Sequence, residues 1–424
     1  MKNFKLNSFT KTLNIFHIRH VVLLLLLFAM TTACDKEDAP IPEEEQILID
    51  PLKEKEEEEE EKEEETPQPP TQNDINQVDT AVSNFMTKHG VPGAALAVSV
   101  NEKMVYTKGF GLSNTNTNKA TEADDVFRIA SISKTFTATA IMKLVEEGKL
   151  ALSDKVFGPG GVLGSDFGSA TLTTNEMNIT VDHLLIHSSG GWGVSTGGDP
   201  MDFEQQLDAN SFIEYIFNNW DLQNAPGTTY SYSNYGYWLL ARIIERVSQE
   251  TFEAYISTML TPTGATSFKT TTFREEDREP NEVEYYASAQ ENHWIYTMAP
   301  RRDGDGGVVI STPDLLRFIC AIDGRNGRQD LISTPTQGFM AEPSEFSILG
   351  RGFGVWEQEN LLFFTGSLPG TRTWFYLNPQ NGVTAVIALN SRGNSSEFDN
   401  DLNTLVYNLV KDASIPWQTD LDLF

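Results

Sequence analysis

The sequence predicts an α+β protein in which an antiparallel sheet is flanked by helices and joined to a mostly helical lobe. Residues 93–108 form two strand-like runs that turn at Asn101-Glu102. Residues 374–389 form two more around Asn381-Gly382, which is a strong hairpin signal. From Gly148 to about residue 300 the pattern is helical and rich in loops. Strands near both ends of the chain, with helices between them, are typical of the α+β class.

The composition limits the partners and the number of lobes. The chain has 424 residues and a formal net charge of −29. Its first 73 residues hold 8 basic and 17 acidic residues, which leaves a net charge of −20 for the remainder. A domain this acidic has no electrostatic attraction for nucleic acid or for anionic lipid. The remaining stretch is long enough for an α/β lobe of about residues 74–150 and 300–424 and a helical lobe of about residues 151–299.

Residues 1–33 have the composition of a secretory signal. Basic residues precede the apolar run 21–30, which is too short to span a bilayer as a helix, and small residues lead to Cys34. This end resembles the lipobox of bacterial lipoproteins, although Thr31 replaces the usual leucine, and the acidic run 35–38 resembles a signal for export to the cell surface. We therefore expect Cys34 to be lipidated and to anchor the protein in the bacterial cell envelope, at the outer membrane. Ordinary secretion with a free Cys34 is the alternative.

Residues 34–73 are expected to form an acidic, proline-rich tether. The run 54–65 is mostly glutamate and repels itself, and the prolines that follow it cannot lie inside a helix. This composition predicts a solvated spacer between the lipid anchor and a domain of residues 74–424.

The other elements of the domain follow from hydrophobic periodicity and capping residues. Apolar residues after Ser131 recur at helical spacing and end at Gly148. A helix over about residues 235–247 has an apolar stripe, with Ser233 or Asn234 as its cap. Further helices are expected at 76–88, 179–187 and 401–411, strands at 352–356 and 361–364, and a strand that turns into a helix at 306–315.

Ser131 and Lys134 form a Ser-x-x-Lys motif at the start of a predicted helix. Residues three apart on a helix share a face, so this hydroxyl and this amine can meet. Serine is a weak nucleophile unless a neighbouring group takes its proton. Lysine can take a proton only as a neutral amine, which burial and the positive end of a helix both favour. The same spacing at Ser8 and Lys11, within the signal segment, shows that the motif needs supporting context.

Three other features suggest sites of other kinds. Ser195 fits the Gly-x-Ser-x-Gly nucleophile elbow, but its glycine-rich surroundings lack the strand and helix that an elbow requires. His183 and His187 are four residues apart, but no glutamate or third ligand accompanies them, so we expect neither a metal nor another cofactor. Cys320 lies in an apolar helical run and is expected to be a buried core residue, and with Cys34 lipidated we expect no disulfide.

Five stretches carry the strongest functional signal because they occur in one order along the chain. They are residues 127–134, 179–185, 226–234, 306–315 and 366–371. Together they resemble the serine β-lactamase and penicillin-binding-protein family, near its class C-like esterases and D-amino-acid peptidases. The resemblance covers about residues 74–413 and implies the β-lactamase/transpeptidase-like fold.

The resemblance also implies roles for residues of the first three motifs. Ser131 would be the acylated nucleophile, and Lys134 would accept its proton. Tyr232 would pass the proton to the leaving group, and Asn234 would hydrogen-bond Lys134 or the substrate. The backbone amides of Ser131 and Ser367 would form the oxyanion hole.

The family's last motif, Lys-Thr-Gly or His-x-Gly, differs in this chain. It reads Phe364-Thr365-Gly366 and is followed by Ser367, and we expect all four residues to line the substrate site. Phe364 offers neither a charge nor a hydrogen bond, which argues against efficient recognition of a β-lactam or a D-Ala-D-Ala carboxylate. An uncharged ester or amide fits better. Arg372 follows six residues after Gly366, and we expect it on the surface.

These observations lead to one main hypothesis and three rivals. The main hypothesis is a monomeric, lipid-anchored serine hydrolase that acts through an acyl-enzyme on a small or peptidoglycan-like substrate. The rivals are a non-catalytic protein that binds ligands in the same cleft, a genuine β-lactamase or DD-peptidase, and an α/β-hydrolase that uses Ser195.

Overall fold

The computed structural model describes residues 74–194, 198–393, 395 and 397–424. The expected signal segment, the tether with Cys34, and Ser195 all lie outside these residues. In the described part of the chain, no helix combines the length and the apolar character needed to cross a membrane.

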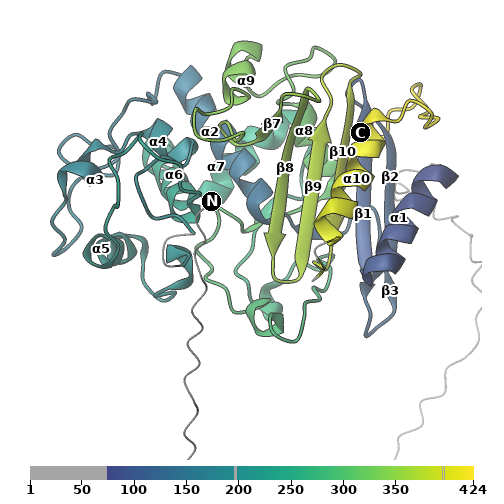
Figure 1. The fold of residues 1–424 in the computed structure, drawn as a ribbon, viewed down its shortest axis with the longest axis horizontal. Helices are drawn as coiled ribbons and strands as arrows, with labels where there is room; N and C mark the ends of the chain where they lie inside the picture. The colour runs from purple at the N-terminus through teal and green to yellow at the C-terminus, as the bar shows by residue number, and fades with distance from the viewer. Residues whose placement is uncertain (1–73, 195–197, 394, 396) are drawn as a thin grey trace, which may run out of the picture. The chain divides into compact units, whose positions relative to one another are not determined.

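A seven-stranded antiparallel sheet forms the centre of the described domain (Figure 1). Its strands, in spatial order, are β3 (Lys119–Ala120), β2 (Lys103–Asn114), β1 (Gly93–Val100), β10 (Val383–Leu389), β9 (Thr371–Leu377), β8 (Leu361–Leu368) and β7 (Gly354–Trp356). Strand β1 pairs with β10 in register from Ala94 opposite Leu389 to Val100 opposite Val383. Segments from the two ends of the domain therefore join in one sheet.

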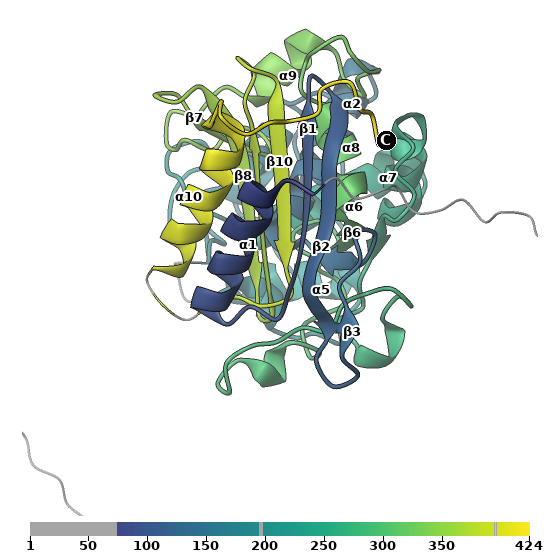
Figure 2. The same cartoon turned by 90° about the vertical axis from the view of Figure 1, so that its right-hand side faces the viewer.

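Helices cover both faces of this sheet. On one face, α1 (Asn76–His89) and α10 (Phe398–Lys411) lie side by side (Figure 2). On the other face, α8 (Thr312–Cys320) packs against β1 and β10. Alternate residues of β1 point to the two layers, since Leu96 joins the apolar cluster of α1 and α10 and Ala97 joins that of α8. A strand covered on both faces has few polar positions, as the sequence of β1 shows.

A three-stranded sheet leads from the central sheet into the helical region. Its order is β4 (Val126–Arg128), β6 (Val308–Ser311) and β5 (Lys269–Thr270). Strand β4 runs into one 3-10 turn, η1 (Ala130–Ile132), and then into α2 (Ser133–Glu146).

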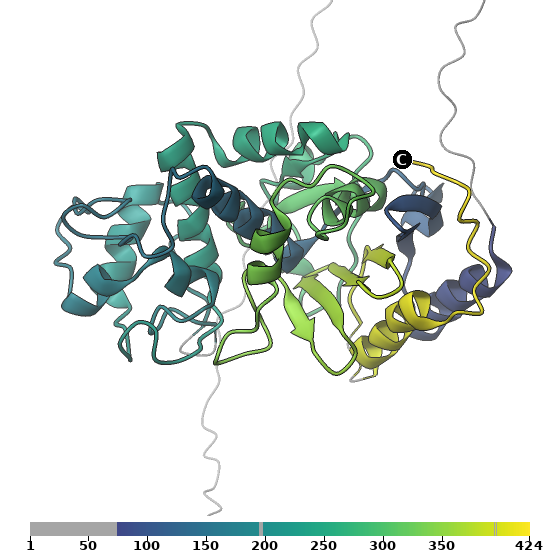
Figure 3. The same cartoon turned by 90° about the horizontal axis from the view of Figure 1, so that it is seen from above.

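The remaining helices gather on one side of the central sheet (Figure 3). They include α3 (Thr174–Asn178), α4 (Val181–Leu185), α5 (Ala209–Asn219), α6 (Asn234–Ser248), α7 (Phe252–Leu260) and α9 (Thr334–Met340), with short 3-10 turns η2 (Pro200–Asp202), η3 (Thr261–Thr263), η4 (Glu275–Asp277) and η5 (Asn292–Trp294). Helix α6 packs against α2, α4 and α7. The apolar residues of α6 are buried up to Ile244, and Val247 at its end is partly buried, so α6 forms the core of this region.

The predicted α+β class is confirmed. One local feature, the turn at Asn381-Gly382, differs from the prediction, and the predicted burial of Cys320 is confirmed. The turn at Asn381-Gly382 is a longer loop, in which Asn378 N–H donates to Val383 O and Gly382 N–H donates to Asn378 O, both at 2.9 Å. Cys320 is buried as predicted, and its sulfur lies 3.3 Å from Ser99 Oγ.

Candidate active site

Ser131 lies on the 3-10 turn η1, just ahead of the α-helix whose start the sequence predicts here. The preceding residue, Ala130, has a φ of 50°, a left-handed conformation that residues with side chains seldom adopt. Ser133 holds this turn in place. Its hydroxyl donates to Ala130 O at 2.6 Å and accepts from the N–H of Val308 at 3.0 Å. Ser133 thereby ties the turn of Ser131 to strand β6.

Lys134 is fully buried on the first turn of α2, and its amine faces Ser131. The amine donates to Ser131 Oγ at 3.4 Å, to Asn234 Oδ1 at 2.7 Å and to the carbonyl of Asp305 at 2.6 Å. These three oxygens surround the nitrogen and hold it beside Ser131. The structure therefore brings together Ser131, Lys134 and Asn234, which come from motifs about 100 residues apart.

Tyr232 joins this cluster from the segment just before α6. The Lys134 amine lies 5.0 Å from the centre of the Tyr232 ring and 5.7 Å from that of Tyr237. Ser233 caps α6 by accepting from the N–H of Gly236 at 2.9 Å, which fixes the chain direction at Tyr232. The amine is thus enclosed by two aromatic rings.

The His187 ring packs against the Tyr232 ring, a contact that the sequence did not predict. The two rings lie 4.4 Å apart and are tilted by 31°. His187 Nδ1 accepts from the N–H of Ser233 at 3.1 Å. Burial first, and then the nearby charge of Lys134, lower the pKa of His187 well below its usual 6.5. His187 is therefore a neutral imidazole, and its contacts are those of a packing residue for Tyr232.

The other histidine of the predicted pair has a separate partner. His183 Nδ1 accepts from the N–H of Thr180 at 3.2 Å, as part of the capping box of α4. Within the described ranges, no group of three or more His, Cys, Asp and Glu side chains is arranged to hold a metal ion.

A closed circuit of polar contacts fixes Asn234 and Lys134. Asn234 Nδ2 donates to Asp199 Oδ2 at 2.7 Å, and Asp199 pairs with Arg302 at 2.9 Å. Arg302 also pairs with Asp305 at 2.9 Å, and the backbone carbonyl of Asp305 accepts from Lys134. The four side chains and the Asp305 carbonyl are thus linked in one chain of contacts around the amine, although Arg302 Nε and Asp305 Oδ1 are buried without a hydrogen-bond partner among the described residues.

Charge and burial act in opposite directions on the two carboxylates of this circuit. Burial alone would raise the pKa of Asp199, but the charge of Arg302 and the hydrogen bonds from Asn234 and Arg302 hold it below its usual value. Burial raises the pKa of Asp305 to about 7, although Arg302 and Lys134 oppose that shift. Asp199 is therefore the more easily ionised of the two carboxyl groups.

Strand β8 carries the altered last motif and lies directly against the turn of Ser131. A Cβ atom on Gly366 would lie 1.9 Å from the carbonyl oxygen of Ile129, so only glycine allows this approach. Ser367 is exposed, and Thr365 is half-buried. Phe364 is 5% exposed and belongs to the main hydrophobic cluster, which gives it the contacts of a core residue.

Arg372 does not lie on the surface, and the expectation for it was wrong. Arg372 lies on strand β9 and is only 7% exposed. Its Nε donates to Asp399 Oδ1 at 2.8 Å, and its Nη1 donates to the carbonyl of Gly366 at 3.0 Å. A β-strand alternates its side chains between two covered faces here, and α10 supplies the carboxylate that makes burial of this arginine possible. The charge of Arg372 is therefore paired with Asp399 within the fold.

A cavity of about 330 Å³ opens beside Asn234. Its lining combines acidic, basic and apolar side chains, namely Asp199, Asp202, Asn234, Gln290, Glu291, Trp294, Met298, Leu368, Pro369, Arg302 and Arg392. Trp294 is 41% exposed and offers an aromatic wall. Ser131, Lys134 and Tyr232 do not line this cavity, but Asn234 does, and its Oδ1 accepts from the Lys134 amine. We therefore expect a substrate in this space.

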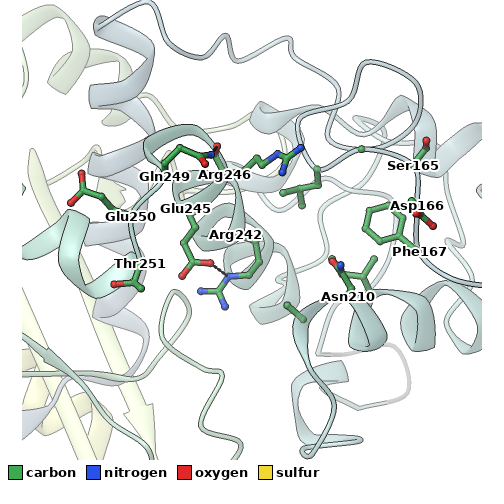
Figure 4. Close-up of a pocket in the computed structure, with 14 residues that line it drawn as sticks. Ser165, Asp166, Phe167, Asn210, Arg242, Glu245, Arg246, Gln249, Glu250 and Thr251 are labelled. Carbon is green, nitrogen blue, oxygen red and sulfur yellow. Dashed lines mark hydrogen bonds and ion pairs between the residues drawn. The ribbon is translucent and has the colours of Figure 1, made fainter.

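A larger cavity, of about 730 Å³, lies elsewhere in the helical region (Figure 4). Arg242, Glu245 and Arg246 of α6 line it, together with residues 163–167 and the start of α5. Arg242 pairs with Glu245 at 3.1 Å. Neither Asn234 nor any of Ser131, Lys134 and Tyr232 lines this cavity, so no residue of the site connects it to the nucleophile.

The residues on either side of Ser195 bear on the nucleophile-elbow alternative. Described residues 188–194 form no strand, and the first element after the gap is the 3-10 turn η2. The strand and helix that an elbow requires are thus missing from the described residues around Ser195.

The fold, together with Ser131 and the buried amine of Lys134 beside it, defines a β-lactamase-type domain. The chain belongs to the Beta-lactamase family, whose pattern matches residues 78–408. Protein flp of Staphylococcus aureus is 26% identical over 339 residues, which cover 76% of this chain and 64% of that protein. This chain therefore spans less than two thirds of that relative's length.

Two solved structures support the fold. A penicillin-binding protein homologue from Pyrococcus abyssi, described as octameric, has a TM-score of 0.62 at 26% identity and covers 80% of this chain and 78% of its own. The D-amino acid amidase from Ochrobactrum anthropi SV3 has a TM-score of 0.65 at 20% identity, and the match covers 80% of this chain and 98% of the amidase. The predicted resemblance to this family is confirmed.

Proposed function

We propose that this protein is a serine hydrolase that cleaves an ester or amide bond of a small or cell-wall-derived substrate through an acyl-enzyme on Ser131. The observation that carries the proposal is the buried amine of Lys134, 3.4 Å from Ser131 Oγ. A hydroxyl within reach of a desolvated amine is a recognised way to activate serine. Membership of the β-lactamase family supports the same reaction class.

In the proposed reaction, Ser131 Oγ attacks the carbonyl carbon while its proton passes to the Lys134–Tyr232 pair. The amides of Ser131 and Ser367 would stabilise the oxyanion of the tetrahedral intermediate. Tyr232 would return the proton to the leaving group as its bond to the carbonyl carbon breaks. A water molecule would then attack the acyl ester and give a proton to the same pair, which would return it to Ser131 Oγ as the bond between Oγ and the acyl carbon breaks and the acid leaves.

The test of this proposal is hydrolysis of p-nitrophenyl acetate by the wild type and by Ser131→Ala and Lys134→Ala variants. Loss of the nucleophile is expected to lower kcat by at least about a thousandfold. Ser189→Ala is the matched control, since Ser189 is buried in the same region and its hydroxyl donates only to the nearby Gly191 O. Equal rates for the wild type and Ser131→Ala would refute the proposal.

One observation favours a second candidate, a protein that binds ligands in this cleft without cleaving them. Phe364 lies in the core where the family motif has a lysine or histidine. A screen of esters, D-amino acid amides and β-lactams separates the two candidates. Turnover of any of these identifies a hydrolase and its class, including a genuine β-lactamase or DD-peptidase, whereas binding without turnover identifies the binder.

The proposed location of this enzyme in the cell rests on the sequence alone. Cys34 would carry a lipid that anchors a monomeric enzyme in the bacterial outer membrane, with residues 34–73 as the spacer. Cys34→Ser should then move the protein from the membrane fraction to the soluble fraction of bacterial cells.

A further inference from the structure

Asp305 brings a carboxyl group to the proposed base, and the proposed reaction assigns this group no role. The backbone carbonyl of Asp305 accepts from the Lys134 amine at 2.6 Å, so the residue lies directly beside the amine. The tight turn of residues 302–306 places it there, because the N–H groups of Asp305 and Gly306 both donate to Arg302 O, at 3.3 and 3.0 Å. Asp305 is only 1% exposed, so solvent screens its side chain weakly from the amine.

The two oxygens of the Asp305 carboxyl group are unequally supported. Oδ2 accepts from Arg302 Nη1 at 2.9 Å, whereas Oδ1 is buried and has no hydrogen-bond partner among the described residues. Arg302 is itself shared, because its Nη2 also donates to Asp199 at 2.9 Å and to Asp202 at 2.5 Å. One guanidinium thus serves three carboxyl groups, of which Asp305 is the most deeply buried.

The charged groups near Asp305 lie on its own turn, on α2, on α6 and on the loop before η2. They are Arg302 and Asp303 of the turn, Lys134, Arg242 and Asp199. The positive charges of Arg302 and Lys134 favour the carboxylate form of Asp305, and the two neighbouring aspartates oppose it. Burial has the largest effect and raises the pKa of Asp305 to about 7. Asp305 therefore gains and loses a proton near neutral pH.

The interaction between Asp305 and Lys134 acts in both directions. Because the charge of Lys134 stabilises the carboxylate of Asp305, that carboxylate stabilises the ammonium form of Lys134 to the same extent. The other groups at the amine are Ser131 Oγ, Asn234 Oδ1, the rings of Tyr232 and Tyr237, and the neutral ring of His187. Among the carboxyl groups of the polar circuit, Asp305 belongs to the residue that touches the amine, whereas Asp199 reaches it through Asn234.

We propose that the carboxyl group of Asp305 controls the proton on Lys134 and thereby sets the pH range in which Ser131 is activated. The inference rests on the proposed hydrolase function and adds to it a positioning residue that regulates the same site. As a carboxylate, Asp305 retains the proton on Lys134, and an ammonium group cannot take the proton of Ser131 Oγ. When the carboxylate charge is absent, the amine loses that proton to water more readily and can act as the base.

The first test is the pH dependence of kcat/KM for p-nitrophenyl acetate, after correction for spontaneous hydrolysis. On the acid side, kcat/KM should fall as Lys134 gains its proton. Asp305→Asn should move this acid limb to lower pH by about one unit, because it removes a negative charge from a buried site next to the amine. Asp305→Ala should move the limb in the same direction without adding an amide donor to the buried site.

Asp323→Asn is the matched control for these two variants. Asp323 is also a buried aspartic acid whose pKa burial raises to about 7, but its charged neighbours are Glu102, Asp330 and Arg325. The control should leave the acid limb in place. A purely structural role of Asp305 would lower kcat without moving the limb. A limb that stays in place, or that moves to higher pH, in either Asp305 variant overturns the proposal.

A second measurement tests the interaction without hydrolysis. Carbon-13 NMR of protein labelled at the aspartate carboxyl carbon follows the ionisation of Asp305, whose signal is the one missing from the Asp305 variants. Lys134→Met removes the attracting ammonium, so it should raise the midpoint of this titration by about one pH unit.

The NMR result separates this proposal from the hydrolase function on which it rests. A raised midpoint in a protein that hydrolyses no ester would support the interaction of Asp305 with Lys134 and reject the hydrolase. Equal midpoints in the wild type and in Lys134→Met would overturn the proposal, even if the wild type is an active hydrolase.

Discussion

Asp199 accepts a 2.7 Å hydrogen bond from the amide nitrogen of Asn234, and this contact determines which atom of Asn234 faces Lys134. With its nitrogen committed to Asp199, Asn234 presents its oxygen to the Lys134 amine, also at 2.7 Å. Arg302 holds Asp199 in turn. The position of the amine beside Ser131 therefore depends on residues that never touch the proposed substrate carbonyl.

Asp199→Ala should consequently lower kcat for ester hydrolysis by about 10- to 100-fold, because a small misplacement of the reacting groups has a large effect on rate. Asp199→Asn keeps an acceptor for Asn234 and should retain more activity than the alanine variant. Asp208→Asn is the control, since Asp208 is an acidic N-cap on the neighbouring helix α5. Steady-state kinetics of the three variants check this, and full activity in Asp199→Ala would show that Asn234 needs no such support.

His187 should make stability depend on pH in a defined direction. Its pKa in the folded protein lies below the value of 6.5 expected in the unfolded chain. The folded state therefore favours the neutral ring, and this contribution is complete above pH 6.5 and is lost as the pH falls below it. The loss is at most about 1.4 kcal/mol per pH unit.

The variant His187→Asn should remove this dependence. Asparagine tolerates the φ of 57° at this position and can still accept from Ser233. The measurement is the free energy of unfolding by urea between pH 5 and 8 for both proteins. The difference between them should be constant above pH 7 and should shrink at lower pH. A difference that grows as the pH falls would mean that His187 is charged in the fold.

Ser133 should matter for stability and for activity, although it is not a proposed reacting group. Ser133→Ala leaves the buried N–H of Val308 without its partner and removes one of the two donors to Ala130 O, which should cost about 1–3 kcal/mol of folding free energy. The turn that carries Ser131 would loosen, so kcat should fall as well. Thr139→Ala is the control, because its hydroxyl bonds only within α2, to Thr135 O. A drop in stability with unchanged kcat would separate Ser133 from the site.

Gly366 should not tolerate even a methyl group. A Cβ atom there meets Ile129 O at 1.9 Å, so Gly366→Ala must move β8 away from the turn of Ser131. We expect activity to be lost while the sheet remains folded. Gly338→Ala is the matched control: it lies in α9 with no atom within 4 Å of the new Cβ and should stabilise the protein slightly. Circular dichroism and ester hydrolysis of the two variants compare them, and an active Gly366→Ala would contradict the close approach.

The sequence predicted those features whose cause is local. The α+β class, the helix after Ser131 and the capped helix α6 follow from periodicity and capping residues. The spacing of Ser131 and Lys134 likewise implied that their side chains could meet.

The supporting contacts were beyond prediction, because each depends on a long-range pairing. Asp199 lies in a glycine-rich loop, and no local pattern connects it to Arg302, 103 residues later. His187 drew attention only as a possible metal ligand, since nothing nearby in the chain shows that it packs on Tyr232. Arg372 was expected on the surface, because its carboxylate partner comes from another element, α10.

The central claim is that Ser131 becomes acylated, and the most direct measurement is intact-protein mass spectrometry after brief exposure to an activated ester, followed by peptide mapping. The wild type should gain the mass of one acyl group, located on the peptide that contains Ser131, and Ser131→Ala should gain none there. An adduct of equal yield in Ser131→Ala, or acylation of the wild type at another serine, would contradict the account.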